Sequence, residues 1–332
     1  MPIIGAKDGT KLPTRSETTH SPLAAEPPAD ELALALKFAR AEKSEATRRA
    51  YRSDFRTFKK WCAARNIAAL PATPAALAAF LACEARRGAK PSSISRRIAG
   101  IRYAHLLAGH EPPNQAEMVK ATFRGIRRSV GTAPKRKQPL TADYVRAMAE
   151  ATPDSLIGLR DRALLLIGFA GALRRSEIVS LDVADLAGTK AGLRLHIRAS
   201  KTDQERQGAT VAIAPSGSTT CPIAALNRWL TAAGIDHGPV FRQMVKGGRV
   251  ADKRLSGHAV AEIIKSYAKC IGLDPTAFSG RSLRAGFLTS CARNGASIFK
   301  MKEISRHKSM DTLQGYVRDA DFFRDHAGAG LL

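Results

Sequence analysis

The chain has 332 residues, 44% of them hydrophobic, and its 53 Lys and Arg against 29 Asp and Glu give a formal net charge of +24. This length allows two domains with separate cores, and the lack of any run of 18 apolar residues argues against an ordinary membrane span. So large a positive surplus favours a polyanionic partner, most often a nucleic acid, over a basic surface of no particular purpose.

Residues 1–30 are rich in Pro, Thr, Ser and Ala and contain no continuous apolar segment. This composition predicts a disordered tail and not a signal peptide, so we expect a cytoplasmic, nucleoid-associated protein without a membrane partner. The five cysteines form no CxxC pair, and the chain contains neither an HExxH nor a Walker-type GxxxxGK motif. The sequence therefore predicts no metal site and no site of nucleotide hydrolysis.

Residues 31–128 are predicted to form an all-helical domain. Its clearest helix begins after Ser44, a favourable N-cap residue, and carries one apolar stripe through Tyr51, Phe55 and Phe58. Further helices are expected at about 74–87, directly after Pro91, and at about 115–127.

Cations crowd the polar side of these helices and the segment that follows them. A solvated face is the alternative explanation, but a face with so few acids would repel itself unless it met phosphates, so DNA contact is favoured. The residues predicted to bind DNA are Arg48, Arg49, Arg52, Arg56, Lys59, Arg96, Arg97, Lys135, Arg136 and Lys137.

Residues 129–139 are basic and interrupted by Gly and Pro, which predicts an interdomain linker able to follow DNA. A second domain, residues 140–332, begins with a helix capped by Thr141, followed by an apolar helix at about 156–170. Strict alternation of apolar and polar residues over 193–198 predicts a β-hairpin whose return strand covers about 210–213. Its connecting loop contains Lys201, and four more helices are expected at about 221–233, 257–271, 281–294 and 298–306.

Three segments of this domain place a cation or an acid–base group beside a helix boundary. In the first, 171–178, Arg174 lies between two helices, and Glu177 follows one turn later, where it could hold the guanidinium. In the second, 279–287, Arg281 and Arg284 lie on one side of a helix start, which favours anions. The third places His307 nine residues before Tyr316, with a short helix expected between them. Each segment taken alone is more often structural than functional.

Taken in order, these residues resemble the signature of the tyrosine site-specific recombinases, also called phage integrases. The family's GLRxSEL box is matched by 171–178 and its hairpin lysine by Lys201. Its HxLRH box is matched by 281–285, and its GHxxxxTxxxY box by 306–316, with the spacing from His to Tyr intact. The resemblance covers about residues 32–325.

This resemblance implies a mainly α fold with a small antiparallel β-sheet. The helical domain would be the core-binding, SAM-like domain of the family, and residues 140–332 would be an α+β catalytic domain with a C-terminal tail. The implied activity is site-specific cutting and rejoining of double-stranded DNA through a 3′-phosphotyrosine, without a cofactor, by a homotetramer assembled on the DNA.

The resemblance also implies a role for each matched residue. Tyr316 would attack the phosphate, Lys201 would protonate the departing 5′-oxygen, and Glu177 would orient the first arginine. The implied catalytic residues are Arg174, Lys201, Arg281, Arg284, His307 and Tyr316.

Three positions depart from the family pattern. Arg281 and Ala285 replace the two histidines of HxLRH, and Arg306 replaces the glycine before His307. An arginine can hold a phosphate oxygen but cannot act as a base, so activity reduced by Arg281 is one reading of the sequence. A catalytically impaired member serving as a DNA-binding regulator or architectural protein is therefore left open. A type IB topoisomerase and a basic RNA-binding protein explain the order of the motifs and the helical domain less well.

Overall fold

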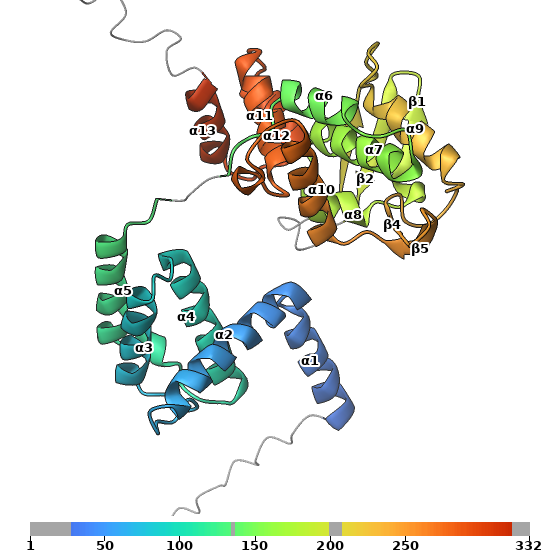
Figure 1. The fold of residues 1–332 in the computed structure, drawn as a ribbon. Coiled ribbons are helices and arrows are strands. Elements are labelled where there is room, and N and C mark those ends of the chain that lie inside the picture. The colour runs from blue at the N-terminus through green and yellow to red at the C-terminus, as the bar shows by residue number, and fades with distance from the viewer. Residues whose placement is uncertain (1–27, 134–136, 199–207, 321–332) are drawn as a thin grey trace, which may run out of the picture. The chain divides into compact units, whose positions relative to one another are not determined.

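The computed structural model describes residues 28–133, 137–198 and 208–320, and the chain divides into two units between Pro134 and Lys135 (Figure 1). The helices described in the N-terminal unit are α1 (Ala29–Ala41), α2 (Glu45–Ala63), α3 (Pro74–Arg86), α4 (Pro91–Leu107) and α5 (Glu117–Val130). The predicted disordered tail lies almost entirely outside the described residues. Among the described residues, no helix is both long and apolar enough to span a bilayer.

Local signals fix where these helices begin. The Ser44 hydroxyl accepts a hydrogen bond from the backbone N–H of Thr47, and α3 and α4 each have proline in their first turn. The three starts agree with the prediction. The end of α5 does not, because the helix continues through Val130 and so includes residues that were assigned to the linker.

The core of the N-terminal unit is built around an aromatic cluster. Helix α2 packs on α4 and α3 packs on α5. The ring centroids of Phe58 and Phe80 are 5.0 Å apart, and Trp61 packs against the ring edge of Phe80 at 5.6 Å. Large aromatic side chains bury about 150–250 Å² each, so this cluster is expected to dominate the stability of the unit.

The C-terminal unit is mixed. Its described helices are α6 (Ala142–Glu150), α7 (Leu156–Ala170), α8 (Arg175–Ser180), α9 (Pro222–Ala232), α10 (Gly257–Cys270), α11 (Ser282–Arg293), α12 (Ile298–Ser305) and α13 (Met310–Ala320). Its described strands are β1 (Leu186–Thr189), β2 (Gly192–Ile197), β3 (Ala209–Ile213), β4 (Arg242–Met244) and β5 (Val250–Arg254). The mainly α fold with a small antiparallel sheet is confirmed.

Strands β1, β2 and β3 form one antiparallel sheet, and β4 pairs with β5. The predicted alternation is observed in β2, where Leu193, Leu195 and Ile197 are buried between exposed neighbours. Residue Leu195 lies opposite Val211 on β3, so both strands turn the same apolar face inward. The loop that joins these strands, with Lys201, lies outside the described residues.

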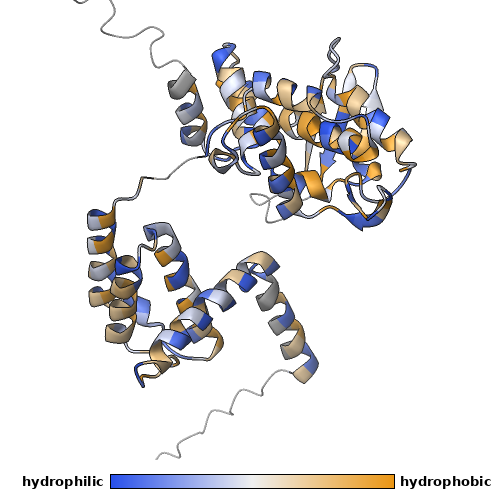
Figure 2. Ribbon diagram, in the orientation of Figure 1, coloured by the Kyte–Doolittle hydropathy of each residue, from blue (hydrophilic) through white to orange (hydrophobic). Residues whose placement is uncertain are grey.

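Helix α7 is the centre of this unit. It packs against α6, α8, α9 and α11, and most of its residues are buried. Apolar residues gather around it and around β2 in the interior of the unit (Figure 2). The α7–α8 turn and the start of α11, which both pack on this core, carry the arginines described next.

Candidate functional site

The turn between α7 and α8 holds Arg174 in a fixed place. Arg174 is the N-cap residue of α8, and Glu177 in the first turn accepts hydrogen bonds from both its backbone and its side chain. The Glu177 Oε2 atom lies 2.9 Å from the Arg174 backbone nitrogen, and Oε1 lies 2.6 Å from Nη1. Glu177, which is 1% exposed, therefore holds the Arg174 guanidinium, a contact that the spacing of the two residues predicted; the burial of the carboxylate was not predicted.

Helix α11 brings Arg284 to the same turn. This side chain is buried, and its Nη1 donates to the carbonyl of Ala172, at a distance of 2.8 Å. Its Nη2 lies 3.4 Å from both ring nitrogens of His307, so the guanidinium faces the imidazole ring. Arg284 thus connects the α7–α8 turn to the segment that follows α12.

That segment places Arg306 and His307 side by side at the end of α12. Arg306 has a left-handed backbone, with φ 56° and ψ 41°. Its Nη2 donates to Oε2 of Glu177 at 2.7 Å, so one carboxylate holds arginines from two distant segments. The Ser305 hydroxyl lies 2.8 Å from Nδ1 of His307 and fixes the ring from the other side.

The candidate nucleophile, Tyr316, lies inside α13 and not after a helix, which corrects the prediction of a short helix between His307 and Tyr316. It packs against a small apolar cluster that includes Leu288, Met301 and the fully buried Leu313. Tyr316 interacts electrostatically with Arg284, so the phenol lies near the guanidinium cluster of its own chain.

Burial and neighbouring charges shift the pKa values of the groups in this cluster. Burial, followed by the charge of Arg174, lowers the pKa of Arg284 to about 9, which still leaves it protonated at neutral pH. Burial and the neighbouring arginines lower the pKa of His307 to about 4, so its ring is neutral. Burial alone would raise the pKa of Glu177, but Arg306 and Arg174 outweigh it and the carboxyl stays ionised. Three guanidiniums therefore face one carboxylate, and the excess charge suits an anion.

The structure brings most of the expected site residues together. The cluster unites Arg174, Glu177, Arg284 and His307, with Tyr316 close by. Arg281 stands at the N-cap position of α11 with an exposed side chain and has no ion pair with any described residue. Arg306 was noted in the sequence only as a departure from a pattern, and its ion pair with Glu177, 129 positions away, carries no local sequence signal.

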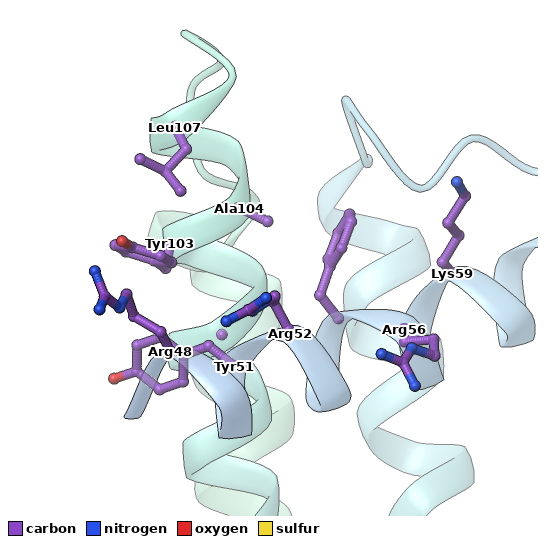
Figure 3. Close-up of a pocket in the computed structure, with 10 residues that line it drawn as sticks. Arg48, Tyr51, Arg52, Arg56, Lys59, Tyr103, Ala104 and Leu107 are labelled. Atoms are coloured by element: carbon purple, nitrogen blue, oxygen red, sulfur yellow. The ribbon is translucent and has the colours of Figure 1, made fainter. Parts of the chain in front are cut away.

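The N-terminal unit contains a groove of about 720 Å³ between α2 and α4 (Figure 3). Its aromatic lining includes Tyr51 and Tyr103, whose ring centroids are 5.6 Å apart. Helix α2 contributes a row of cations to the groove: Arg48, Arg52, Arg56 and Lys59. Tyr51 was predicted to lie on the apolar stripe of its helix, and its place in one groove with the cations was not predicted. The sequence indicates which residues share one helix face but not which helix lies opposite.

The remaining cations predicted to bind DNA have different surroundings. Arg96 makes a two-pronged ion pair with the buried Asp54, at 2.8 and 3.0 Å. Arg97 is mostly buried and pairs with Glu84, so it is engaged inside the domain. Arg49 lies 3.7 Å from Glu45 on the exposed surface of α2. Lys137 donates to the carbonyl of Thr276, whereas Lys135 and Arg136 lie outside the described residues.

Comparison with known proteins covers both units. The phage integrase family model matches residues 138–321, and that of the phage integrase N-terminal SAM-like domain matches residues 35–111. An integrase/recombinase xerD homolog from Selenomonas ruminantium is 36% identical over 297 residues, which cover 87% of this chain and 86% of that protein. A tyrosine recombinase XerC from Xanthomonas axonopodis pv. citri is 29% identical over 81% of this chain and 84% of its own length.

Solved structures share the fold at low identity. The XerH site-specific recombinase bound to a palindromic difH substrate has a TM-score of 0.56 at 15% identity, covering 76% of this chain and 70% of that one. A lambda integrase dimer bound to a core site has a TM-score of 0.56 at 17% identity, covering 87% and 77%. The family matches to both units and the 36% identity to a relative of nearly full length show that this chain belongs to the phage integrase family, the tyrosine recombinases.

Proposed function

We propose that Arg174, Arg284 and His307 bind the phosphate that is cut, and that Tyr316 attacks it. This proposal rests on the way in which distant segments of the chain come together. Three segments far apart in the chain meet around Glu177 and Arg284, and the helix bearing Tyr316 packs beside them. Guanidiniums already fixed in place stabilise the charge that builds on the non-bridging oxygens in the transition state.

In the proposed reaction the Tyr316 oxygen forms a bond to phosphorus, and the bond from phosphorus to the 5′-oxygen breaks. The phenol releases its proton to solvent water, and the 5′-oxygen gains a proton from Lys201, which we assign as general acid. His307, neutral by its lowered pKa, donates a hydrogen bond to a phosphate oxygen. Rejoining is the reverse of this step, since the phosphotyrosine keeps the energy of the broken bond.

The proposed substrate is double-stranded DNA with a specific recombination site, bound by a homotetramer in the nucleoid. Support for the polyanion comes from the charge of +24 and from the cations that line the α2–α4 groove. Among the described residues, Arg52, Arg56 and Lys59 have no carboxylate within ion-pair distance, and the buried Asp54 of the same helix is paired with Arg96 and Arg97 of α4. We assign this groove to the DNA backbone.

The test of the proposed nucleophile uses duplexes selected for binding to the Tyr316→Phe protein from a randomised pool and then nicked to trap the cleaved state. We expect the natural chain to form a covalent protein–DNA adduct on a denaturing gel. Tyr316→Phe should form none, because it lacks the attacking oxygen, and it should still bind the duplex.

An adduct that persists in Tyr316→Phe would assign the nucleophile to another residue. An inert natural chain that binds the selected duplexes as tightly as the Phe variant would overturn the catalytic proposal and leave only DNA binding.

A further inference from the structure

One buried carboxylate links two parts of the proposed site that are far apart in sequence. Glu177 Oε1 accepts a hydrogen bond from Nη1 of Arg174. Its Oε2 accepts hydrogen bonds from the Arg174 backbone N–H and from Nη2 of Arg306. Arg306 precedes His307 directly, and the segment between α12 and the helix of Tyr316 begins there. The Glu177 carboxylate therefore connects the α7–α8 turn to the end of α12.

The backbone of Arg306 makes this side chain unexpected. Its φ of 56° lies in the left-handed region, where a glycine fits with least strain and an arginine is disfavoured. The Arg306 side chain is nevertheless mostly buried, with 11% of it exposed, and it makes further contacts with the two segments that Glu177 connects. Its Nη1 donates to the carbonyl of Ile304 at 2.7 Å and lies 3.5 Å from that of Gly171. It thus spans the gap from α12 to the end of α7.

We infer that Arg306 is a positioning residue, which holds the segment of His307 and Tyr316 in register with Arg174 by sharing Glu177. This inference rests on the proposed function of the cluster. Arg306 itself need not touch the DNA, since its contacts are with protein atoms.

A charge count gives the second effect of the shared carboxylate. Without Arg306, the negative charge of Glu177 would be balanced by Arg174 alone. The pair of Arg174 and Glu177 would then have no net positive charge to attract a phosphate. With Arg306 present, the cluster of three arginines and one carboxylate keeps a surplus of two positive charges for the substrate. The positive charge of Arg306 also contributes to the low pKa of His307.

The experiment compares Arg306→Gly and Arg306→Lys with the natural chain in single-turnover cleavage of the selected nicked duplexes. Glycine suits the left-handed backbone, so the first variant is expected to fold, and circular dichroism measures its folded fraction. Lys300→Ala is the matched control, because Lys300 is an exposed cation of α12, the helix that Arg306 caps, and its only described partner is Glu303.

We expect Arg306→Gly to slow cleavage at saturating DNA by about tenfold or more, since small misplacements of reacting groups are costly. The DNA concentration for half-maximal rate should stay within about twofold, as expected when an interaction matters only in the transition state. Arg306→Lys should recover part of the rate because it restores the charge but not the fork of two nitrogens. Lys300→Ala should cleave like the natural chain.

A double-mutant cycle tests whether Glu177 mediates the effect. The double variant Glu177→Gln, Arg306→Gly should slow cleavage by less than the product of the two single effects, because both changes remove the same ion pair between Arg306 and Glu177. The low-pH limb of the rate should also move to higher pH in Arg306→Gly, since His307 loses one cationic neighbour.

Equal rates for the natural chain and Arg306→Gly would overturn this inference while leaving the proposed function intact. So would a rate loss no greater than the loss of folded protein, or two effects that multiply independently. An inert natural chain would overturn both the proposed function and the inference.

Discussion

At the scale of single residues, His307 is the group most affected by its surroundings. It lies against Arg284, close to Arg174 and Arg306, and only Glu177 among the contributing charges favours its protonation. Burial acts in the same direction as the three cations, because a charged imidazole loses its hydration. The pKa falls from its usual 6.5 to about 4 as a result.

This shift predicts a loss of stability in acid. Between pH 6.5 and about 4 the unfolded chain binds a proton that the folded chain excludes, so the free energy of unfolding falls as pH falls through this window. We expect the fall to be smaller in His307→Gln, which has no imidazole to protonate. Chemical denaturation of both proteins across this range measures it, with each protein's stability in mildly alkaline buffer as the reference.

Identical pH dependence in the two proteins would mean that His307 is protonated as easily in the folded chain as in the unfolded chain.

The sequence predicted the contact between Arg174 and Glu177 because the two residues are one helical turn apart, where side chains meet. It did not predict the contact of Arg306 with Glu177, which spans 129 positions and depends on how α12 meets the α7–α8 turn. Nor did it separate the buried Arg284 from the exposed Arg281, because the spacing of two residues does not reveal which of them points into the core.

At the scale of elements, α11 is held close to the segment that leads into the C-terminal unit. The Leu140 backbone N–H donates to the carbonyl of Ser282, and Gly286 lies under the backbone of Leu140. A Cβ added at Gly286 would lie 1.6 Å from the Leu140 carbonyl oxygen, a distance that no packing tolerates. The glycine is therefore what lets α11, with Arg284, pack at this depth.

We predict that Gly286→Ala destabilises the C-terminal unit by about 2 kcal/mol or more, as is typical when a well-packed site is overfilled. It should also slow cleavage, because the start of α11 must shift. Gly188→Ala in β1 is the control, since a Cβ there meets nothing within 4 Å. Thermal unfolding with single-turnover cleavage measures both effects, and a Gly286→Ala protein as stable as the control would contradict this account of the close approach.

Most helices of both units and the β2–β3 hairpin were predicted from the sequence, whereas three short strands and the start of the last helix were not. The helices α2, α3, α4 and α7 and the β2–β3 hairpin agree with their caps and their periodicity. Strands β1, β4 and β5 were missed, since their short sequences lack the alternation of apolar and polar residues that marks β2, and they form only by pairing with a neighbour. The helix bearing Tyr316 was misplaced because its packing against Leu288 and Met301 is tertiary.

At the scale of the whole molecule, the chain has separate cores in its two units and a large positive surplus. One unit carries the α2–α4 groove and the other the arginine cluster. Counterions released when cations replace them on phosphates make binding strongly dependent on salt. Mutations in the α2–α4 groove should therefore change the salt dependence of DNA binding, whereas mutations in the arginine cluster should change the rate of cleavage.

We predict that the double variant Arg52→Gln, Arg56→Gln lowers the slope of log affinity against log salt by about 1.8, since each lost phosphate contact removes about 0.9. Cleavage at saturating DNA should be unchanged, because these residues line the groove of the other unit. Lys60→Gln is the control, an exposed cation of α2 outside the groove lining. Fluorescence anisotropy over a salt series measures the slope, and an unchanged slope would remove the two arginines from the interface.

The division of the chain between Pro134 and Lys135 has a consequence for how tightly DNA can be held. On the proposed function, once one unit binds a duplex, the covalent chain between the units raises the effective concentration of that duplex at the other unit, so the second contact forms almost as an intramolecular event. Two modest affinities then combine into high avidity. Cutting the chain between the units should therefore weaken the binding of DNA.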